Sequence, residues 1–167
     1  FLAMTLAAAS AVAWCAAFVL LPWLADGVSL TAMLLLGPWL AAAGLVVWTL
    51  VATWIAVVAK EVLIGRYVPT RVPAWSSLHV RHWVVVRLVR LVPWSLLAGT
   101  TAQHAVLRAL GARIGRRVHI HRAVDLLGGG WDLLELGDDV TLQRETELVT
   151  CELDDGDFVV GAVRIDE

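Results

Sequence analysis

The sequence predicts a membrane protein. Two transmembrane α-helices form a hairpin, an amphipathic helix follows, and the chain then starts a left-handed parallel β-helix. Asp26 is the only charged residue among the first 59, and a membrane-spanning helix needs about 20 apolar residues. Basic residues gather directly after this stretch, and beyond Gly111 aliphatic residues recur at every sixth position. These observations divide the chain into a transmembrane hairpin (1–60), a connector region (61–111) and β-helix rungs (112–167).

The two spanning helices are expected at Leu2–Leu24 and Leu30–Ala59, joined by a turn at 25–29. Alanines crowd the first helix, and small residues let helices approach closely in lipid, so we expect it to pack against other helices. Gly37-Pro38 predicts a kink or a late start in the second helix. Tryptophans near the helix ends suit the membrane interface: Trp23, Trp48 and Trp54.

Charge segregates by sign along the rest of the chain. Residues 60–122 hold eleven Lys or Arg and one acid, whereas 123–167 hold two Arg and thirteen acids. Cytoplasmic flanks of spanning helices are enriched in Lys and Arg. We therefore predict an inner (plasma) membrane location with residues after 60 in the cytoplasm and the Asp26 turn outside. The net charge of −2 sums three unlike blocks and says little about partners.

The connector Glu61–Ser77 precedes a predicted amphipathic helix, Leu78–Val92. One side of that helix is apolar, although Arg81 interrupts it, and the other side is polar. A basic amphipathic helix after a spanning helix suits the headgroup plane, and burial against neighbouring protein is the alternative. The apolar side holds Val80, Val84, Val85, Leu88, Val89, Leu91 and Val92, and the polar side holds His79, His82, Arg87 and Arg90.

A short helix is predicted after Pro93, which stops the amphipathic one. Thr100 as N-cap and Gln103 three residues later form a capping box, and Gly111 ends the helix. His104 lies within it and is interpreted as a surface or packing residue.

The chemistry-bearing part starts after Gly111. Residues 114–118 and 136–140 share the pattern aliphatic-Gly-polar-polar-Val. An aliphatic residue every six positions is the pattern of a left-handed β-helix, whose three-sided coil takes eighteen residues. Each glycine is expected near a corner, where a Cβ is costly. The aliphatic series are Ile114, Ile120, Leu126 and Leu136, Leu142, Leu148.

The two glycine motifs lie 22 residues apart, four more than one coil, so 128–131 is expected to loop out of the wall. Residues 154–157 break the period, and 164–167 read as another rung. Barely two rungs are present, whereas about three are needed for stability. Together with a start inside an apolar segment, this predicts a piece of a larger protein that is inactive alone.

The run 107–115, Leu-Arg-Ala-Leu-Gly-Ala-Arg-Ile-Gly, resembles the opening of hexapeptide-repeat acyltransferases. With the hairpin and the connector residues Gly65-Arg66-Tyr67, Trp75-Ser76 and Arg81, the whole chain resembles one repeat of the C-terminal membrane region of poly-ε-lysine-synthetase-type nonribosomal peptide synthetases. In that family, three such repeats follow an adenylation and a carrier domain.

The resemblance implies acyl transfer, in which an amine attacks a carrier-bound aminoacyl thioester and an amide or isopeptide bond forms. It implies no cofactor bound directly, with a phosphopantetheine-linked substrate and ATP serving the full-length protein. The implied partners are membrane lipid, a carrier domain, and sibling repeats or subunits that form a pseudo-trimer, with no nucleic acid among them.

His119 and His121 are the candidate catalytic bases. They alternate with the inward Ile120, so both are expected to point out of the prism, where an adjacent prism can meet them. An imidazole titrates near pH 6.5, at about the value that suits removal of an amine proton. Solvated wall histidines are the structural alternative. Two ligands alone are weak support for a metal pair, so no metal is predicted.

Other candidates carry weaker signals. Asp125 completes an HxxxD pattern with His121, but condensation domains use HHxxxDG and this chain departs from it at both flanks. Arg116 and Arg117 are candidates for the phosphate of a pantetheine arm, or else a solvated edge. Trp131-Asp132 edges a pocket or packs as a corner loop. The acids at 154, 155 and 157 are a solvated loop or attract a cationic substrate. Cys15 and Cys151 are expected to be unpaired.

Two rival functions remain. The first is a membrane-tethered O- or N-acetyltransferase that uses acetyl-CoA and needs a trimer with more rungs. The second is a non-catalytic scaffold that docks a carrier domain or positions sibling repeats. The sequence leaves open the amino-acid substrate and whether this repeat is active.

Overall fold

The computed structural model describes residues 30–144 and 146–166. The first predicted spanning helix, the Asp26 turn and Cys15 lie outside the described residues. The chain divides into two compact units, 1–51 and 52–167, and the boundary falls inside one long helix.

That helix, α2, runs from Leu30 to Leu63 and continues through Pro38 without a break. Within the described part of the chain it is the one helix whose length and composition would allow it to cross a membrane, over 34–63. Its last three turns belong to the second unit. There Ala52, Ala56 and Lys60 are buried along one stripe, because residues four apart lie on the same face of a helix.

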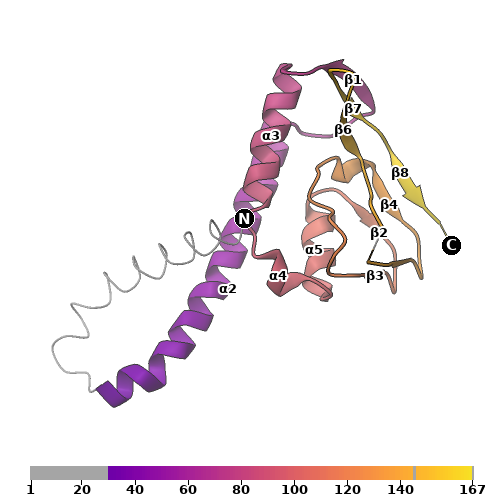
Figure 1. Ribbon diagram of the computed structural model, residues 1–167. Coiled ribbons are helices and arrows are strands. Elements are labelled where there is room, and N and C mark those ends of the chain that lie inside the picture. Colours follow the sequence, from indigo (N-terminus) through magenta and orange to yellow (C-terminus); the bar gives the residue numbers. More distant parts are fainter. Residues whose placement is uncertain (1–29, 145, 167) are drawn as a thin grey trace. The chain divides into compact units, whose positions relative to one another are not determined.

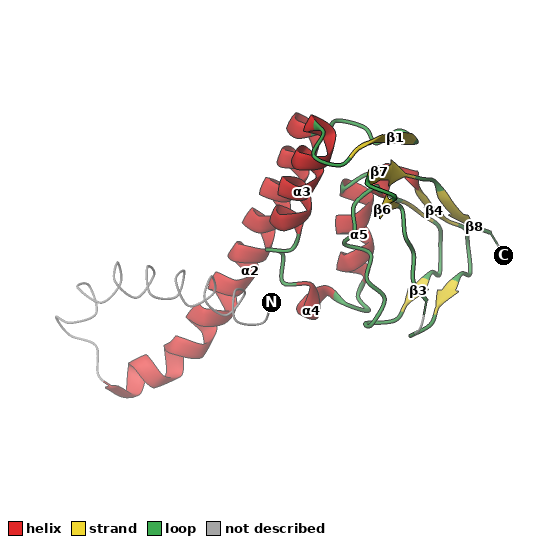
Figure 2. Cartoon of the chain, turned by 45° about the horizontal axis from the view of Figure 1, so that its top comes forward, coloured by secondary structure: helices red, strands yellow, loops and turns green. Residues whose placement is uncertain are grey.

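The second unit then adds three helices. α3 (Ser77–Val89) begins at the N-cap Ser76, whose hydroxyl accepts the His79 N–H. Figures 1 and 2 both show α3 running back alongside the last turns of α2. Val85 and Val89 are fully buried, while Val80 and Trp83 on the other side are about half exposed. α4 (Trp94–Leu97) and α5 (Thr101–Ala109) follow.

The ends of α5 fit the sequence only in part. Thr100 is the N-cap, but its hydroxyl donates to Leu97 O and the Gln103 side chain accepts the Gly99 N–H, so the predicted capping box is wrong. At the other end Gly111 has φ +108°, and the N–H groups of Gly111 and Ala112 reach back to Arg108 and Leu107. This is a Schellman motif, and it confirms Gly111 as the stop.

The residues after α5 form short parallel ladders. β2 (Arg113–Ile114) pairs with β4 (Leu134–Leu136), which pairs with β8 (Val163–Ile165), and β3 (His119–Ile120) pairs with β5 (Thr141–Leu142). Ile114 lies opposite Leu136 and Ile120 opposite Leu142, so the two hexapeptide runs stack 22 residues apart. We call these ladders the wall. Whether the wall is part of a left-handed β-helix stays a prediction.

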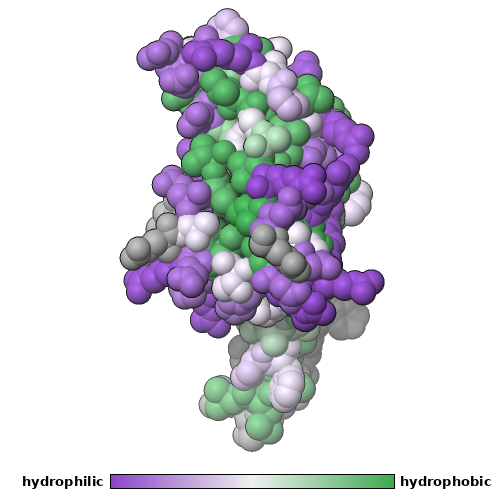
Figure 3. Space-filling view, turned by 90° about the vertical axis from the view of Figure 1, so that its right-hand side faces the viewer, coloured by the Kyte–Doolittle hydropathy of each residue, from purple (hydrophilic) through white to green (hydrophobic). Residues whose placement is uncertain are grey.

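The wall explains Gly115 differently from the sequence argument. Positive φ falls two residues after each glycine, at Arg117 (+55°) and Asp139 (+58°). Gly115 is needed instead for close stacking, because an added Cβ would lie 2.5 Å from the Gly137 carbonyl oxygen. On the side that carries β8, Figure 3 shows apolar surface between hydrophilic side chains, and Val163 and Ile165 are half-buried there.

An antiparallel sheet was not foreseen. β6 (Cys151–Asp154) and β7 (Asp157–Val160) form a hairpin, and β1 (Thr70–Pro73) adds to the other edge of β7. Asp155 (φ +47°) and Gly156 (φ +84°) make the two-residue turn, for which Asp-Gly is a favoured sequence. The predicted acidic loop is therefore the turn of a hairpin, and its acids are solvated as expected. Arg71 of β1 pairs with Asp157 at 2.8 Å and with Asp154 at 3.4 Å.

Candidate functional site

The predicted histidines lie on the outer surface of the wall. Strand β3 buries Ile120 to 1% exposure, and His119 and His121 on either side of it are exposed. Period-two alternation of a strand produces this arrangement, because successive side chains point to opposite faces. The outward orientation predicted for both histidines is therefore present. The His121 Nδ1 accepts the Ala123 N–H at 3.1 Å, which orients its ring.

Helix α5 brings a third histidine to this surface. Burial, followed by the nearby Arg108 and His119, lowers the pKa of His104 below its ordinary value. Arg108 itself donates to the Ile114 and Gly115 carbonyl oxygens at 2.7 and 3.0 Å, so it ties α5 to the start of the wall. The sequence predicts a surface or packing residue at this position, and the structure places His104 within electrostatic reach of the candidate base His119.

The predicted phosphate ligands lie at a corner of the wall. The Arg117 guanidinium donates two hydrogen bonds to the Asp139 carboxylate, 22 residues further along the chain, and this pairing lowers the pKa of Asp139. The Arg116 N–H donates to the Asp138 carboxylate. Both arginines are exposed. Acids therefore balance the positive charge at this corner, which weakens it as a site for a phosphate.

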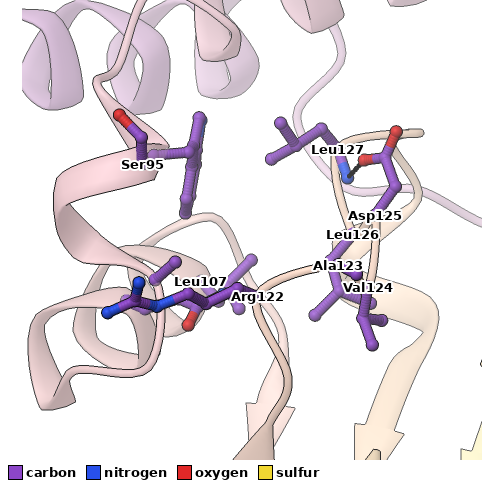
Figure 4. A pocket seen from close by; sticks show the side chains of 11 residues that line it. Ser95, Leu107, Arg122, Ala123, Val124, Asp125, Leu126 and Leu127 are labelled. Carbon is purple, nitrogen blue, oxygen red and sulfur yellow. Dashed lines mark hydrogen bonds between the residues drawn. The ribbon is translucent and has the colours of Figure 1, made fainter. Parts of the chain in front are cut away.

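Asp125 and His121 have different hydrogen-bond partners. The Asp125 Oδ1 accepts the Leu127 N–H at 2.8 Å, a local turn that Figure 4 shows, while His121 is engaged with Ala123. The two side chains thus serve their own turns, which favours coincidence for the HxxxD pattern. Asp125 does line a cavity of about 420 Å³ between the α4–α5 region and residues 122–127.

A buried polar cluster was missed by the sequence analysis. The Lys60 ammonium, whose side chain is 2% exposed, pairs with the Asp132 carboxylate at 2.9 Å and with Glu61 at 2.9 Å. Asp132 also accepts the Tyr67 N–H at 3.0 Å. One carboxylate thus joins the end of α2, the connector and the short 3₁₀ helix η1 (Trp131–Leu133) that precedes β4. Gly111 gives it room, because a Cβ there would overlap the carboxylate.

The cluster continues through aromatic side chains. The Tyr67 hydroxyl and His82 Nδ1 lie 3.0 Å apart, and the Tyr67 ring meets Trp131 edge-on. Trp131 is fully buried and donates its indole N–H to Leu126 O, so it packs as a corner loop rather than at a pocket edge. His82 contacts Phe158 of β7, with 4.7 Å between ring centroids. The predicted polar side of α3 is therefore turned partly into protein.

Burial removes His82, Tyr67 and Cys151 from acid–base chemistry near neutral pH. Burial, and then the neighbouring His79, lowers the pKa of His82 to about 4. Burial, with smaller effects of Cys151 and Asp132, raises the pKa of Tyr67 above its ordinary value. Burial also raises the pKa of the Cys151 thiol to about 12, so that thiol is a poor nucleophile. The cluster is suited to holding elements together, and the exposed histidines are better placed for proton transfer.

The sequence carried faint signals for the cluster. Lys60 is the first charge after a long apolar helix, and Asp132 follows a tryptophan in a glycine-rich segment. Neither position reveals a partner 72 residues away in the chain. As to metals, the described residues contain no group of three His, Cys, Asp or Glu side chains that could hold an ion.

Comparison with known proteins supports a relationship to the peptide-synthetase type. Over 111 residues the chain is 27% identical to the Delta-poly-L-ornithine synthetase of Acinetobacter baumannii (strain AB307-0294). Those residues are 66% of this chain and 8% of that synthetase, so the match covers less than a tenth of the relative's length. The comparison supports this broader relationship and not the poly-ε-lysine type in particular. No model of a known family and no solved structure matches the chain.

Proposed function

We propose that this chain is part of a membrane-embedded synthetase region that forms amide or isopeptide bonds. The observation that carries the proposal is the likeness to a protein named as a synthetase of delta-poly-L-ornithine. The exposed histidines of the wall add a chemical basis, since amide formation from a thioester needs a group that takes a proton from the attacking amine.

The proposed reaction is aminoacyl transfer from a carrier thioester. The amine nitrogen attacks the thioester carbon, a C–N bond forms, the C–S bond breaks, and the sulfur leaves as a thiol after taking a proton. His119 accepts the amine proton and returns one to the leaving sulfur, and His121 can do the same once its Nδ1 releases the Ala123 N–H. Because both side chains are exposed on the outer surface, a neighbouring prism or carrier can reach them.

The proposed setting is a bilayer. Helix α2 with the preceding apolar segment is proposed as the hairpin, with residues after 60 in the cytoplasm. The parallel ladders are proposed as the first rungs of a left-handed β-helix, and sibling repeats would meet it as a pseudo-trimer. Half-buried Val163 and Ile165 on the edge strand β8 support a further neighbour there. ATP and the phosphopantetheine-linked substrate are proposed to serve the full-length protein.

The test uses the complete synthetase that contains this chain. His119→Gln together with His121→Gln should lower product formation from a carrier-bound aminoacyl thioester by about 10²- to 10⁴-fold, the usual contribution of a positioned base. Thr141→Val is the matched control. Thr141 of β5 pairs with His119 of β3, is exposed and cannot titrate. Full activity of the double variant would instead favour the non-catalytic scaffold. Transfer of labelled acetyl groups from acetyl-CoA would favour the acetyltransferase.

A further inference from the structure

One guanidinium in the second unit faces a cavity without a protein partner. Arg122 lines the cavity of about 420 Å³. Figure 4 shows its side chain extending from residues 122–127 toward the helices. In residues 30–144 and 146–166, no hydrogen bond or ion pair engages its side chain. Two other arginines of this unit are committed, Arg108 of α5 to carbonyl oxygens and Arg117 to Asp139.

The other polar groups of the cavity are largely used by the protein. Trp94 donates its indole N–H to Val89 O at 2.8 Å, and the Gln103 side chain accepts the Gly99 N–H at 2.9 Å. Asp125 accepts the Leu127 N–H at 2.8 Å. Arg122, the exposed hydroxyl of Ser95 and the Gln103 side-chain N–H groups therefore remain to meet a ligand. Among the described lining residues, the second Asp125 oxygen is the one anionic group beside them. The rest of the lining is apolar, from Leu107, Val124, Leu126 and neighbouring residues.

This composition defines the chemistry of a ligand. A guanidinium binds phosphate through two parallel hydrogen bonds, and the apolar lining takes an aliphatic body. Ligand pockets commonly pair an apolar lining with a few polar groups that fix orientation. An aliphatic arm that carries a phosphate at one end meets both requirements. The acid-balanced corner at Arg116 and Arg117 offers no such lining.

We propose that this cavity binds the phosphopantetheine arm of the acyl donor, with its phosphate on Arg122 and its aliphatic part over the apolar lining. The assignment rests on the proposed function, because aminoacyl transfer from a carrier requires such an arm. The proposed phosphate ligand is thus Arg122, in place of Arg116 and Arg117, which the sequence suggested. Coenzyme A carries the same arm, so the experiment includes it as a separate ligand.

The test measures binding to the full chain in detergent by isothermal titration calorimetry. 4′-Phosphopantetheine should bind at least about tenfold more tightly than pantetheine, because a charge-assisted contact contributes more than 1.4 kcal/mol, which corresponds to a factor of ten. In Arg122→Gln the two ligands should bind equally. Arg117→Gln is the control and should keep the tenfold preference. Thermal unfolding checks that both variants are folded.

Several results would overturn the proposal. Equal binding of 4′-phosphopantetheine by wild type and Arg122→Gln would remove the role of Arg122, and so would the absence of binding to wild type. Inorganic phosphate binding as tightly as 4′-phosphopantetheine would leave no role for the arm. Tighter binding of dodecyl phosphate would assign the cavity to a lipid. Coenzyme A binding more tightly than 4′-phosphopantetheine would favour a diffusible donor over a carrier. No bond is made in this assay, so its failure leaves the histidine test standing.

Discussion

The histidines of this chain lie in two opposite environments. His82 is part of the buried cluster with Tyr67, Asp132 and Lys60, where burial holds its pKa near 4. His119 and His121 stand exposed on the wall, next to a surface that a neighbour can approach. The difference teaches that a polar cluster deep in a fold is not by itself a reaction centre. Paired and desolvated groups hold elements together, while exposed groups at a surface can exchange protons.

The largest expected effect on stability comes from substitutions of the buried pair Lys60 and Asp132. Removing one member of a buried ion pair leaves an uncompensated charge and costs about 3–5 kcal/mol. Lys60→Met should therefore lower the free energy of unfolding strongly, as should Asp132→Leu. The double variant should lose much less than the sum of the two, because neither charge is then stranded. Denaturant unfolding followed by tryptophan fluorescence measures all three.

The control for that cycle is the exposed pair Arg113–Glu135, at 3.9 Å. Surface pairs contribute about 0–1 kcal/mol, so Glu135→Gln should leave the midpoint nearly unchanged. Additive losses at Lys60 and Asp132 would mean that the two residues act independently, which contradicts the cluster.

A second prediction concerns the glycines beside the cluster. Gly129 has φ +96°, and a Cβ there would overlap the His82 ring. Gly129→Ala should cost about 1–2 kcal/mol for the left-handed backbone alone, and more for the overlap. Gly128→Ala is the matched neighbour, because an added Cβ there meets nothing within 4 Å. Thermal unfolding of the two variants should separate clearly, and equal midpoints would show that His82 does not pack there.

A third prediction concerns the pH dependence of stability. The folded-state pKa of His82 is about 4, below the ordinary 6.5, so the unfolded chain binds more protons between these values. Stability from this group is present above pH 6.5 and is lost as pH falls toward 4, with a slope of at most about 1.4 kcal/mol per pH unit. The free energies of unfolding of wild type and His82→Gln, measured from pH 4.5 to 7.5, isolate the contribution of His82. Parallel curves would place His82 in water.

The elements with local signals could be predicted from the sequence. The apolar run over α2, the Gly111 stop and the 22-residue offset between Ile114 and Leu136 follow from spacing alone. The outward orientation of His119 and His121 follows from strand alternation next to Ile120.

Long-range pairing could not be predicted. The sequence around Lys60 does not indicate Asp132 as its partner, and the sequence around Arg71 does not indicate Asp157. Both ion pairs depend on tertiary contacts between distant segments. The hairpin at Asp155-Gly156 is different, since its Asp-Gly turn signal is present in the sequence, where residues 154–157 break the hexapeptide period. His82 was placed on a polar face because helix periodicity cannot show that a later strand, β7, covers that face.

The central claim is that chemistry lies with the exposed wall histidines and stability with the buried cluster. The most direct test is the turnover per folded molecule of the complete synthetase, compared between His119→Gln/His121→Gln and Lys60→Met/Asp132→Leu. The account predicts a turnover at least about 100-fold below wild type for the histidine variant, with an unchanged unfolding midpoint. For the cluster variant it predicts near-normal turnover by the molecules that remain folded. Normal turnover by the histidine variant, with loss in the cluster variant, would contradict it.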